Sequence, residues 1–203
     1  MMNEHSLEYT SRDFTASLPT AEYIAVYRDA KRFGACCRAC PNYGQSWACP
    51  PFDFDVDKYV STYRTALIIA TKITPLCRTL PLDAAERLLL PERIWHERLL
   101  LSLERRYDGR AFAYAGRCRY CPPGSCTRLT GEACRHPELV RPSLEACGFD
   151  LERTTESLLG IPLQWGEGNQ LPEYLTLVGG FFHNAPEVDL PSVWQELRRS
   201  DGV

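Results

Sequence analysis

Closely spaced thiols are the residues most able to do chemistry in this chain. Eight of its ten cysteines lie in two short runs. The first run is Cys36, Cys37, Cys40 and Cys49, and the second is Cys118, Cys121, Cys126 and Cys134. Thiols gathered in loops rich in proline and glycine are typical ligands of a soft metal ion or an iron–sulfur cluster. The two runs therefore predict metal binding.

The second run has the spacing Cys-x2-Cys-x4-Cys-x7-Cys and supplies four thiolates. A [4Fe–4S] cluster takes one thiolate for each iron, and Pro122, Pro123 and Gly124 favour the tight turn that a Cys-x2-Cys pair needs. We therefore expect Cys118, Cys121, Cys126 and Cys134 to bind a [4Fe–4S] cluster. Structural zinc is the alternative, because a tetrahedron of thiolates tolerates many loop lengths.

The first run predicts a second metal site with an incomplete ligand set. Adjacent cysteines diverge, so we expect either Cys37 or Cys36 to act with Cys40 and Cys49. Three thiolates on a cubane would leave one iron open to a substrate. The fourth ligand could instead be the neighbouring cysteine, Cys77 or a residue of the second run.

A redox-active dithiol, Cys37-Arg-Ala-Cys40, is a further interpretation of the first run. A reactive Cys-x-x-Cys thiol is activated when the motif opens a helix after a strand. Here Pro41 and Gly44 follow the motif, which argues against that arrangement. Structural disulfides are not needed either, because a chain of 203 residues with 44% hydrophobic residues can bury a core without them.

Composition narrows the cellular setting and the partners. A formal net charge of −3 gives no general attraction to nucleic acid or to anionic membranes, and no apolar run is long enough to span a bilayer. The first twenty residues lack the apolar stretch of a secretory signal, so we expect a cytoplasmic protein, where stable disulfides are rare. The sequence does not specify an oligomeric state.

Strands and helices are expected to alternate along the chain. The predicted strands are 22–28, 66–73, 111–115 and 173–182; the predicted helices are 53–63, 83–107 (kinked or split at Pro91), 143–147, 151–159 and 192–200. This order predicts an α/β fold with a small, mostly parallel sheet and helices on its faces. A ferredoxin-like α+β fold is the alternative. We expect residues 1–19 to be loosely ordered and residues 20–203 to form one cysteine-rich domain.

The expected sheet would also bring the two thiol runs together. The first run follows the predicted strand 22–28, and the second follows the predicted strand 111–115. In a parallel sheet the carboxyl ends of these strands lie at one edge, where α/β proteins build their sites. We therefore expect both cysteine-rich loops at that edge.

Several of these motifs resemble a known protein family. They are Cys40-Pro-Asn-Tyr-Gly through Cys49-Pro-Pro, the Cys118-x2-Cys121-x4-Cys126 spacing, and the stretch CRHPELVRPSLEACGFD that begins at Cys134. Over roughly residues 20–182 the chain is similar to DUF2284, a family of prokaryotic proteins described as predicted metal-binding. The resemblance implies metal binding but no particular reaction. The adjacent pair of cysteines departs from the family's single one.

The sequence as a whole favours an iron–sulfur protein that acts in electron transfer or in a reductive step. Its partner would be a redox protein or a small-molecule substrate. The alternative function is that of a zinc-stabilised binding module without redox activity.

Overall fold

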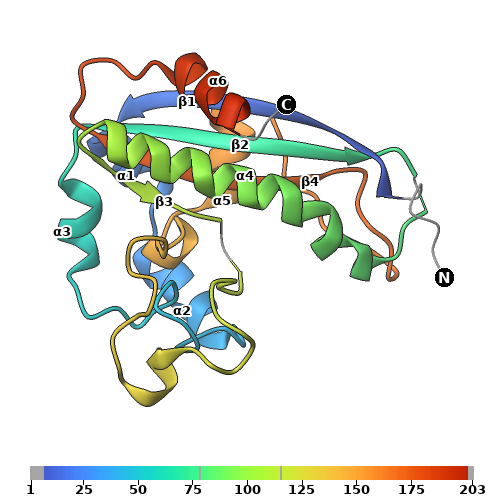
Figure 1. Cartoon of the computed structure of the whole chain (residues 1–203), viewed down its shortest axis with the longest axis horizontal. Helices are drawn as coiled ribbons and strands as arrows, with labels where there is room; N and C mark the ends of the chain where they lie inside the picture. Colours follow the sequence, from blue (N-terminus) through green and yellow to red (C-terminus); the bar gives the residue numbers. More distant parts are fainter. Residues whose placement is uncertain (1–6, 78, 115, 201–203) are drawn as a thin grey trace.

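Four antiparallel strands form the centre of the computed structural model, which describes residues 7–77, 79–114 and 116–200. The strands are β1 (Tyr9–Pro19), β2 (Thr65–Pro75), β3 (Gly109–Phe112) and β4 (Leu175–His183). Their order across the sheet is β1-β2-β4-β3 (Figure 1). The long strands β1, β2 and β4 make up most of the sheet, and the short strand β3 lies at one edge.

The expectation of a mostly parallel sheet is wrong. Strand β4 lies between β2 and β3 and runs antiparallel to both. Strands β2 and β3 therefore point in the same direction, and helix α4 (Ala85–Arg106) makes the crossover between them. The alternation of strands and helices indicated this crossover, but it could not reveal that the last strand inserts between the two. The α+β alternative accommodates the observed sheet.

Each face of the sheet buries its own apolar cluster. On β2, Ala66 and Ile68 pack on the face covered by helices α1, α3 and α5, and Leu67 and Ile69 pack against α4 and α6. These helices are α1 (Thr20–Tyr27), α3 (Val56–Ser61), α5 (Leu151–Leu159) and α6 (Leu190–Ser200). Alternate residues of a strand point to opposite faces, so a continuous apolar run such as that of β2 is buried on both sides.

The segment predicted as a strand over 22–28 is instead helix α1. Tyr23 and Tyr27, one helical turn apart, are buried, whereas Val26 is 37% exposed. The first strand comes earlier, within the segment expected to be loosely ordered. There β1 pairs with β2 along its length, from Tyr9 opposite Pro75 to Pro19 opposite Thr65.

Helix α4 is continuous through Pro91 and slightly shorter at each end than the predicted helix 83–107. Pro91 is exposed and lies within the helix without splitting it. The short 3₁₀ helix η2 (Leu82–Ala84) precedes it, so the α-helix begins at Ala85 and not at residue 83. The predicted helix 151–159 is confirmed as α5, which Asp150 caps by accepting a hydrogen bond from the Arg153 backbone N–H at 3.0 Å.

Candidate metal centre

The two cysteine-bearing segments form a region that we call the cysteine lobe, residues 30–55 and 116–142. Figure 1 shows this lobe beside the sheet, on the side of β3 and away from β1. Its regular structure consists of helix α2 (Ala30–Ala39) and the 3₁₀ helix η3 (Thr127–Thr130). Helix α2 has no buried residue. The lobe is therefore not organised around an apolar core as the sheet is.

The first cysteine run begins inside helix α2 and ends in the loop after it. Cys36 and Cys37 lie in the last turns of the helix, and the backbone N–H of Cys40 donates to the Cys37 carbonyl at 3.1 Å where the helix ends. Cys49 lies in the following loop and is half-buried, whereas Cys36 and Cys40 are exposed. The sequence predicted no regular structure here. The run also lies at the carboxyl end of a helix and not at the end of a strand.

The second run lies almost wholly in irregular structure after β3, as expected. All four of its cysteines are half-buried. Two backbone N–H groups approach its sulfurs: His136 donates to Cys134 Sγ at 3.4 Å, and Tyr120 donates to Cys118. Hydrogen bonds of this kind stabilise the thiolate form, which is the form that binds metal.

A buried carboxylate of α4 anchors the beginning of the second run. Glu97, which is 5% exposed, accepts hydrogen bonds from Arg119 Nε at 2.7 Å and from the Tyr120 hydroxyl at 2.9 Å. Arg93 donates both to Glu97, at 2.9 Å, and to the Arg117 carbonyl, at 2.9 Å. These contacts fix the backbone on both sides of Cys118.

A second carboxylate, two turns further along α4, anchors the end of the run. Glu104 accepts three hydrogen bonds from the Arg141 guanidinium, the shortest at 2.6 Å, and one from the Ala111 backbone N–H at 2.7 Å. Arg141 also donates to the carbonyls of Pro137 and Val140. Charge-assisted, multidentate bonds of this type are stronger than neutral ones.

The two segments of the lobe contact each other directly. Trp47 Nε1 donates to the Thr127 hydroxyl at 3.4 Å, and the Arg128 guanidinium stacks over the Trp47 ring at 4.7 Å. Arg128 also donates to the Pro51 carbonyl. These contacts join the loop that carries Cys49 to the loop that carries the second run.

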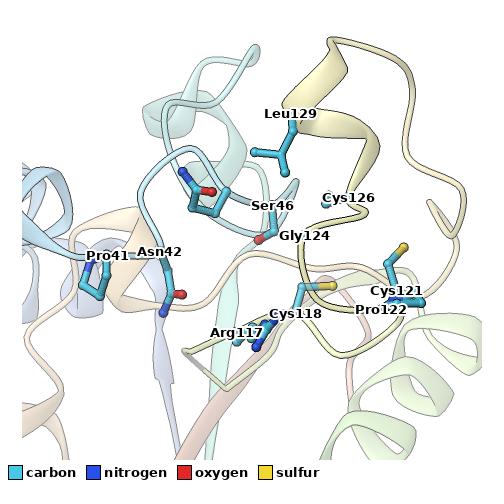
Figure 2. Close-up of a pocket in the computed structure, with 11 residues that line it drawn as sticks. Pro41, Asn42, Ser46, Arg117, Cys118, Cys121, Pro122, Gly124, Cys126 and Leu129 are labelled. Carbon is cyan, nitrogen blue, oxygen red and sulfur yellow. The ribbon is translucent and has the colours of Figure 1, made fainter.

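A cavity of about 260 Å³ lies between the two segments. Figure 2 shows Pro41, Asn42 and Ser46 of the first segment opposite Cys118 and Cys121 of the second. Cys126 and Leu129 complete this side of the wall. The cavity is thus lined by three of the four second-run cysteines and by the loop between Cys40 and Cys49.

Burial and neighbouring thiols raise the pKa of Cys118 in the second run and of Cys37 in the first. Burial raises the pKa of Cys118, and the neighbouring thiols Cys126, Cys121 and Cys134 raise it further. Burial likewise raises the pKa of Cys37, and Cys40 and Cys49 add to the effect. Crowded thiols resist ionisation unless a cation compensates the negative charge, so a bound metal would relieve this repulsion.

The pKa of Cys49 links the two runs. Burial raises it, and the Ser46 side chain lowers it by hydrogen bonding. Among the charged groups, Cys40 and Cys126 raise this pKa and Arg128 lowers it. Cys126 belongs to the second run, so a thiol about 80 residues away in sequence raises the pKa of Cys49.

The thiols lie near one another, but they do not form a complete coordination shell. Across residues 7–77, 79–114 and 116–200, no three Cys, His, Asp or Glu side chains are arranged to hold a metal ion. The donors fit a soft metal in type and number, but their side chains would have to turn towards a common centre. Cys147, outside both runs, is buried in the core, and Cys77 packs against a small apolar cluster beside Leu80.

The sequence interpretation missed the anchoring residues Glu97 and Glu104. A signal was present, because both acidic residues lie on the otherwise apolar stripe of α4, seven positions apart. An acid on the buried face of a helix needs a partner. Here the partners come from the two ends of the second cysteine run.

A family model matches residues 21–181 of the chain, and its description is "Predicted metal-binding protein (DUF2284)". The chain belongs to the DUF2284 family. The match spans both cysteine runs and both anchoring carboxylates, so the family description applies to the region that contains the lobe. Searches of curated proteins and of solved structures found no match. Among the described residues, no helix has the length and apolarity required to cross a membrane.

Proposed function

We propose that this DUF2284 protein is an iron–sulfur protein of the cytoplasm, acting in electron transfer or in a reductive step. Cys118, Cys121, Cys126 and Cys134 would bind a [4Fe–4S] cluster. The observation that supports this most strongly is the convergence of two distant cysteine runs on one lobe, where the contacts Trp47–Thr127 and Arg128–Pro51 join their loops. The partner would be a redox protein or a small-molecule substrate.

The second metal site would use Cys37, Cys40 and Cys49. Cys37 is a better candidate than Cys36, because it is half-buried and its pKa responds first to Cys40 and Cys49 among the thiols. Residues three apart at the end of a helix lie on one side of it, which favours joint ligation by Cys37 and Cys40. Three protein ligands would leave one position of this metal centre for an exogenous group.

The zinc alternative is favoured by one observation, the absence of buried residues in α2. A lobe without an apolar core is the kind of structure that a structural zinc ion stabilises. This alternative predicts zinc in the purified protein, no visible absorption, and loss of the lobe's structure on chelation.

A thiol–disulfide enzyme is disfavoured by the position of the Cys-x-x-Cys pair. Helix α2 ends at this pair, so the partial negative charge of the helix end lies near the thiols. Burial and the neighbouring thiols also raise the pKa of Cys37. An activated nucleophilic thiol requires the opposite shift.

The test is anaerobic purification followed by iron, sulfide and zinc analysis and a visible spectrum. The proposal expects iron and acid-labile sulfide, with absorption that bleaches on reduction. Substitution of Cys118 and Cys121 by serine should remove the cluster, whereas Cys77→Ser, outside both runs, should retain it. A colourless protein that binds only zinc after anaerobic reconstitution with iron and sulfide would overturn the proposal.

A further inference from the structure

A second cavity, of about 390 Å³, lies next to the cysteine lobe but contains none of its thiols. It opens beside β4, at a place where the sheet is incomplete. Strand β3 pairs only with Gly180–His183, so among the described strands none covers Leu175–Val178 on that side. Leu175, Thr176 and Val178 form one wall of the cavity.

The rest of the lining is largely apolar. Leu82 comes from η2, Leu89 from α4 and Leu151 from α5, and Leu163 and Trp165 come from the loop between α5 and β4. Trp165 is 75% exposed, an unusual position for the largest apolar side chain. A cavity of this size with mainly apolar walls has the dimensions of a site for a small organic molecule.

Two polar atoms in this apolar cavity have no partner. Glu145 lines the cavity, and its Oε2 atom is buried without a hydrogen bond in the described structure. The same holds for the hydroxyl of Thr176, which also lines the cavity. A buried polar group without a partner costs about 1–3 kcal/mol, and more when it is charged. Such a cost is tolerated where a ligand supplies the missing bond.

The charges of the residues that line the cavity indicate the charge of the ligand. Among the described residues that line the cavity, Glu145 is the one acidic residue, and none is Lys, Arg or His. Arg93, which stacks against the cavity residue Tyr114 at 5.3 Å, already binds Glu97 and the Arg117 carbonyl. The carboxylate therefore lacks a cationic counterpart from the cavity itself, and it would gain most from a cationic N–H donor.

We propose that this cavity binds a small organic amine with an apolar, preferably aromatic, body, whose ammonium group donates to Glu145. The apolar body would occupy the space between Leu163, Val178 and Trp165. The Thr176 hydroxyl would accept or donate a second hydrogen bond.

The position of the cavity relates this ligand to the metal centre. Tyr114 and Gly116 line this cavity and also line the hollow that borders Cys118 and Cys121. If the proposed function holds, the amine would bind in a cavity that shares these two residues with a hollow beside the cluster, where a substrate of a reductive step could lie. Binding itself depends only on the cavity, so its failure would leave the metal centre standing, and the absence of a cluster would not abolish it.

The experiment uses three probes that share a ring and differ in charge: benzylamine, benzyl alcohol and benzoate. Binding to the anaerobically purified protein is followed by quenching of tryptophan fluorescence and by ligand-observed NMR. We expect benzylamine to bind at least tenfold more tightly than the other two, and we expect Trp165→Phe to abolish the fluorescence change without abolishing the NMR effect. Equal affinity for the three probes would overturn the proposal.

Two variants locate the binding. Glu145→Gln preserves shape and should reduce the benzylamine affinity to that of benzyl alcohol, whereas the exposed control Glu156→Gln should change nothing. Leu82→Trp narrows the mouth at a residue that is 44% exposed, which makes it compatible with folding, and should weaken benzylamine at least tenfold. Unchanged benzylamine affinity in folded Leu82→Trp protein would refute the site even if Glu145→Gln did not fold.

Discussion

In the sheet, β2 buries Ile68 on one face and Ile69 on the other, whereas helix α2 of the cysteine lobe buries no residue at all. The sheet is stabilised by apolar area, which contributes roughly 25 cal/mol for each Å² removed from water. The lobe is held by anchors such as Glu97–Arg119 and Glu104–Arg141 at its margins. We therefore expect the sheet, with its apolar packing, to fold without a ligand, and the lobe, which lacks such packing, to depend on a bound metal.

Removal of the metal is expected to give the largest difference in stability between the cysteine lobe and the sheet. Structural metal ions contribute on the order of 10 kcal/mol to small thiolate domains. After anaerobic chelation, amide hydrogen exchange should speed up by at least about 100-fold in residues 30–55 and 116–142, while β2 and β4 keep their protection. Hydrogen-exchange mass spectrometry measures both. Equal loss in the two regions would show that the sheet also depends on the metal.

A substitution in the apolar core should have the opposite effect, because it should destabilise the sheet and leave metal binding by the lobe intact. Phe182 is fully buried, and its ring lies 4.5 Å from that of Phe112 and 5.9 Å from that of Phe149. Phe182→Ala should lower the free energy of unfolding by about 3–5 kcal/mol in urea titrations followed by circular dichroism. The folded fraction should retain its metal. Trp165→Ala, at an exposed position, is the control and should change stability by less than about 0.5 kcal/mol.

The anchors offer a way to loosen the lobe without touching a thiol. Glu97→Gln keeps the shape but removes the charge that holds Arg119 and Arg93, so it should cost about 1–3 kcal/mol. We expect metal transfer to a chromogenic chelator to be several-fold faster than in the wild type. Glu156→Gln, exposed on α5, provides the baseline. A Glu97→Gln protein that releases metal at the wild-type rate would mean that the anchor does not support the site.

The sequence predicted the elements that have a strong apolar pattern. The prediction failed where contacts with distant residues, such as strand pairing, determine the secondary structure. Strand β2, strand β4 and helix α5 were predicted because their buried residues leave a clear pattern. Strand β1 is mostly polar, and pairing with β2 makes it a strand. The run EYIAVYR fits both a strand and a helix, and the burial of Tyr23 and Tyr27 on one helix face decided for α1.

The candidate site was predicted in composition but not in placement. Cysteine spacing identified both runs, because ligand type and number are properties of local sequence. The inference that both runs leave parallel strands at one edge was wrong, since the first follows helix α2 and the sheet is antiparallel. The runs nevertheless meet. Long-range contacts such as Trp47–Thr127 and Arg128–Pro51 hold them together, and no periodic pattern encodes such contacts.

The smallest expected effect concerns pH and tests the sheet alone. His96 is 1% exposed on α4, and burial lowers its pKa below 6.5, although nearby Asp13 opposes the shift. The unfolded chain then binds the proton more readily than the folded one. Stability is therefore complete above pH 6.5 and falls as the pH drops below it, by at most about 1.4 kcal/mol per pH unit for one group.

Urea titrations of the chelated protein between about pH 7 and pH 5 would measure this slope without interference from metal release. His96→Met fills the space with an apolar side chain and should flatten the slope. Part should remain, because burial also lowers the pKa of His183 at the end of β4. His136→Gln, in the lobe, is the comparison variant. If it flattened the slope as much as His96→Met, the acid sensitivity would originate in the cysteine lobe, and the sheet would not be the independent half that its packing indicates.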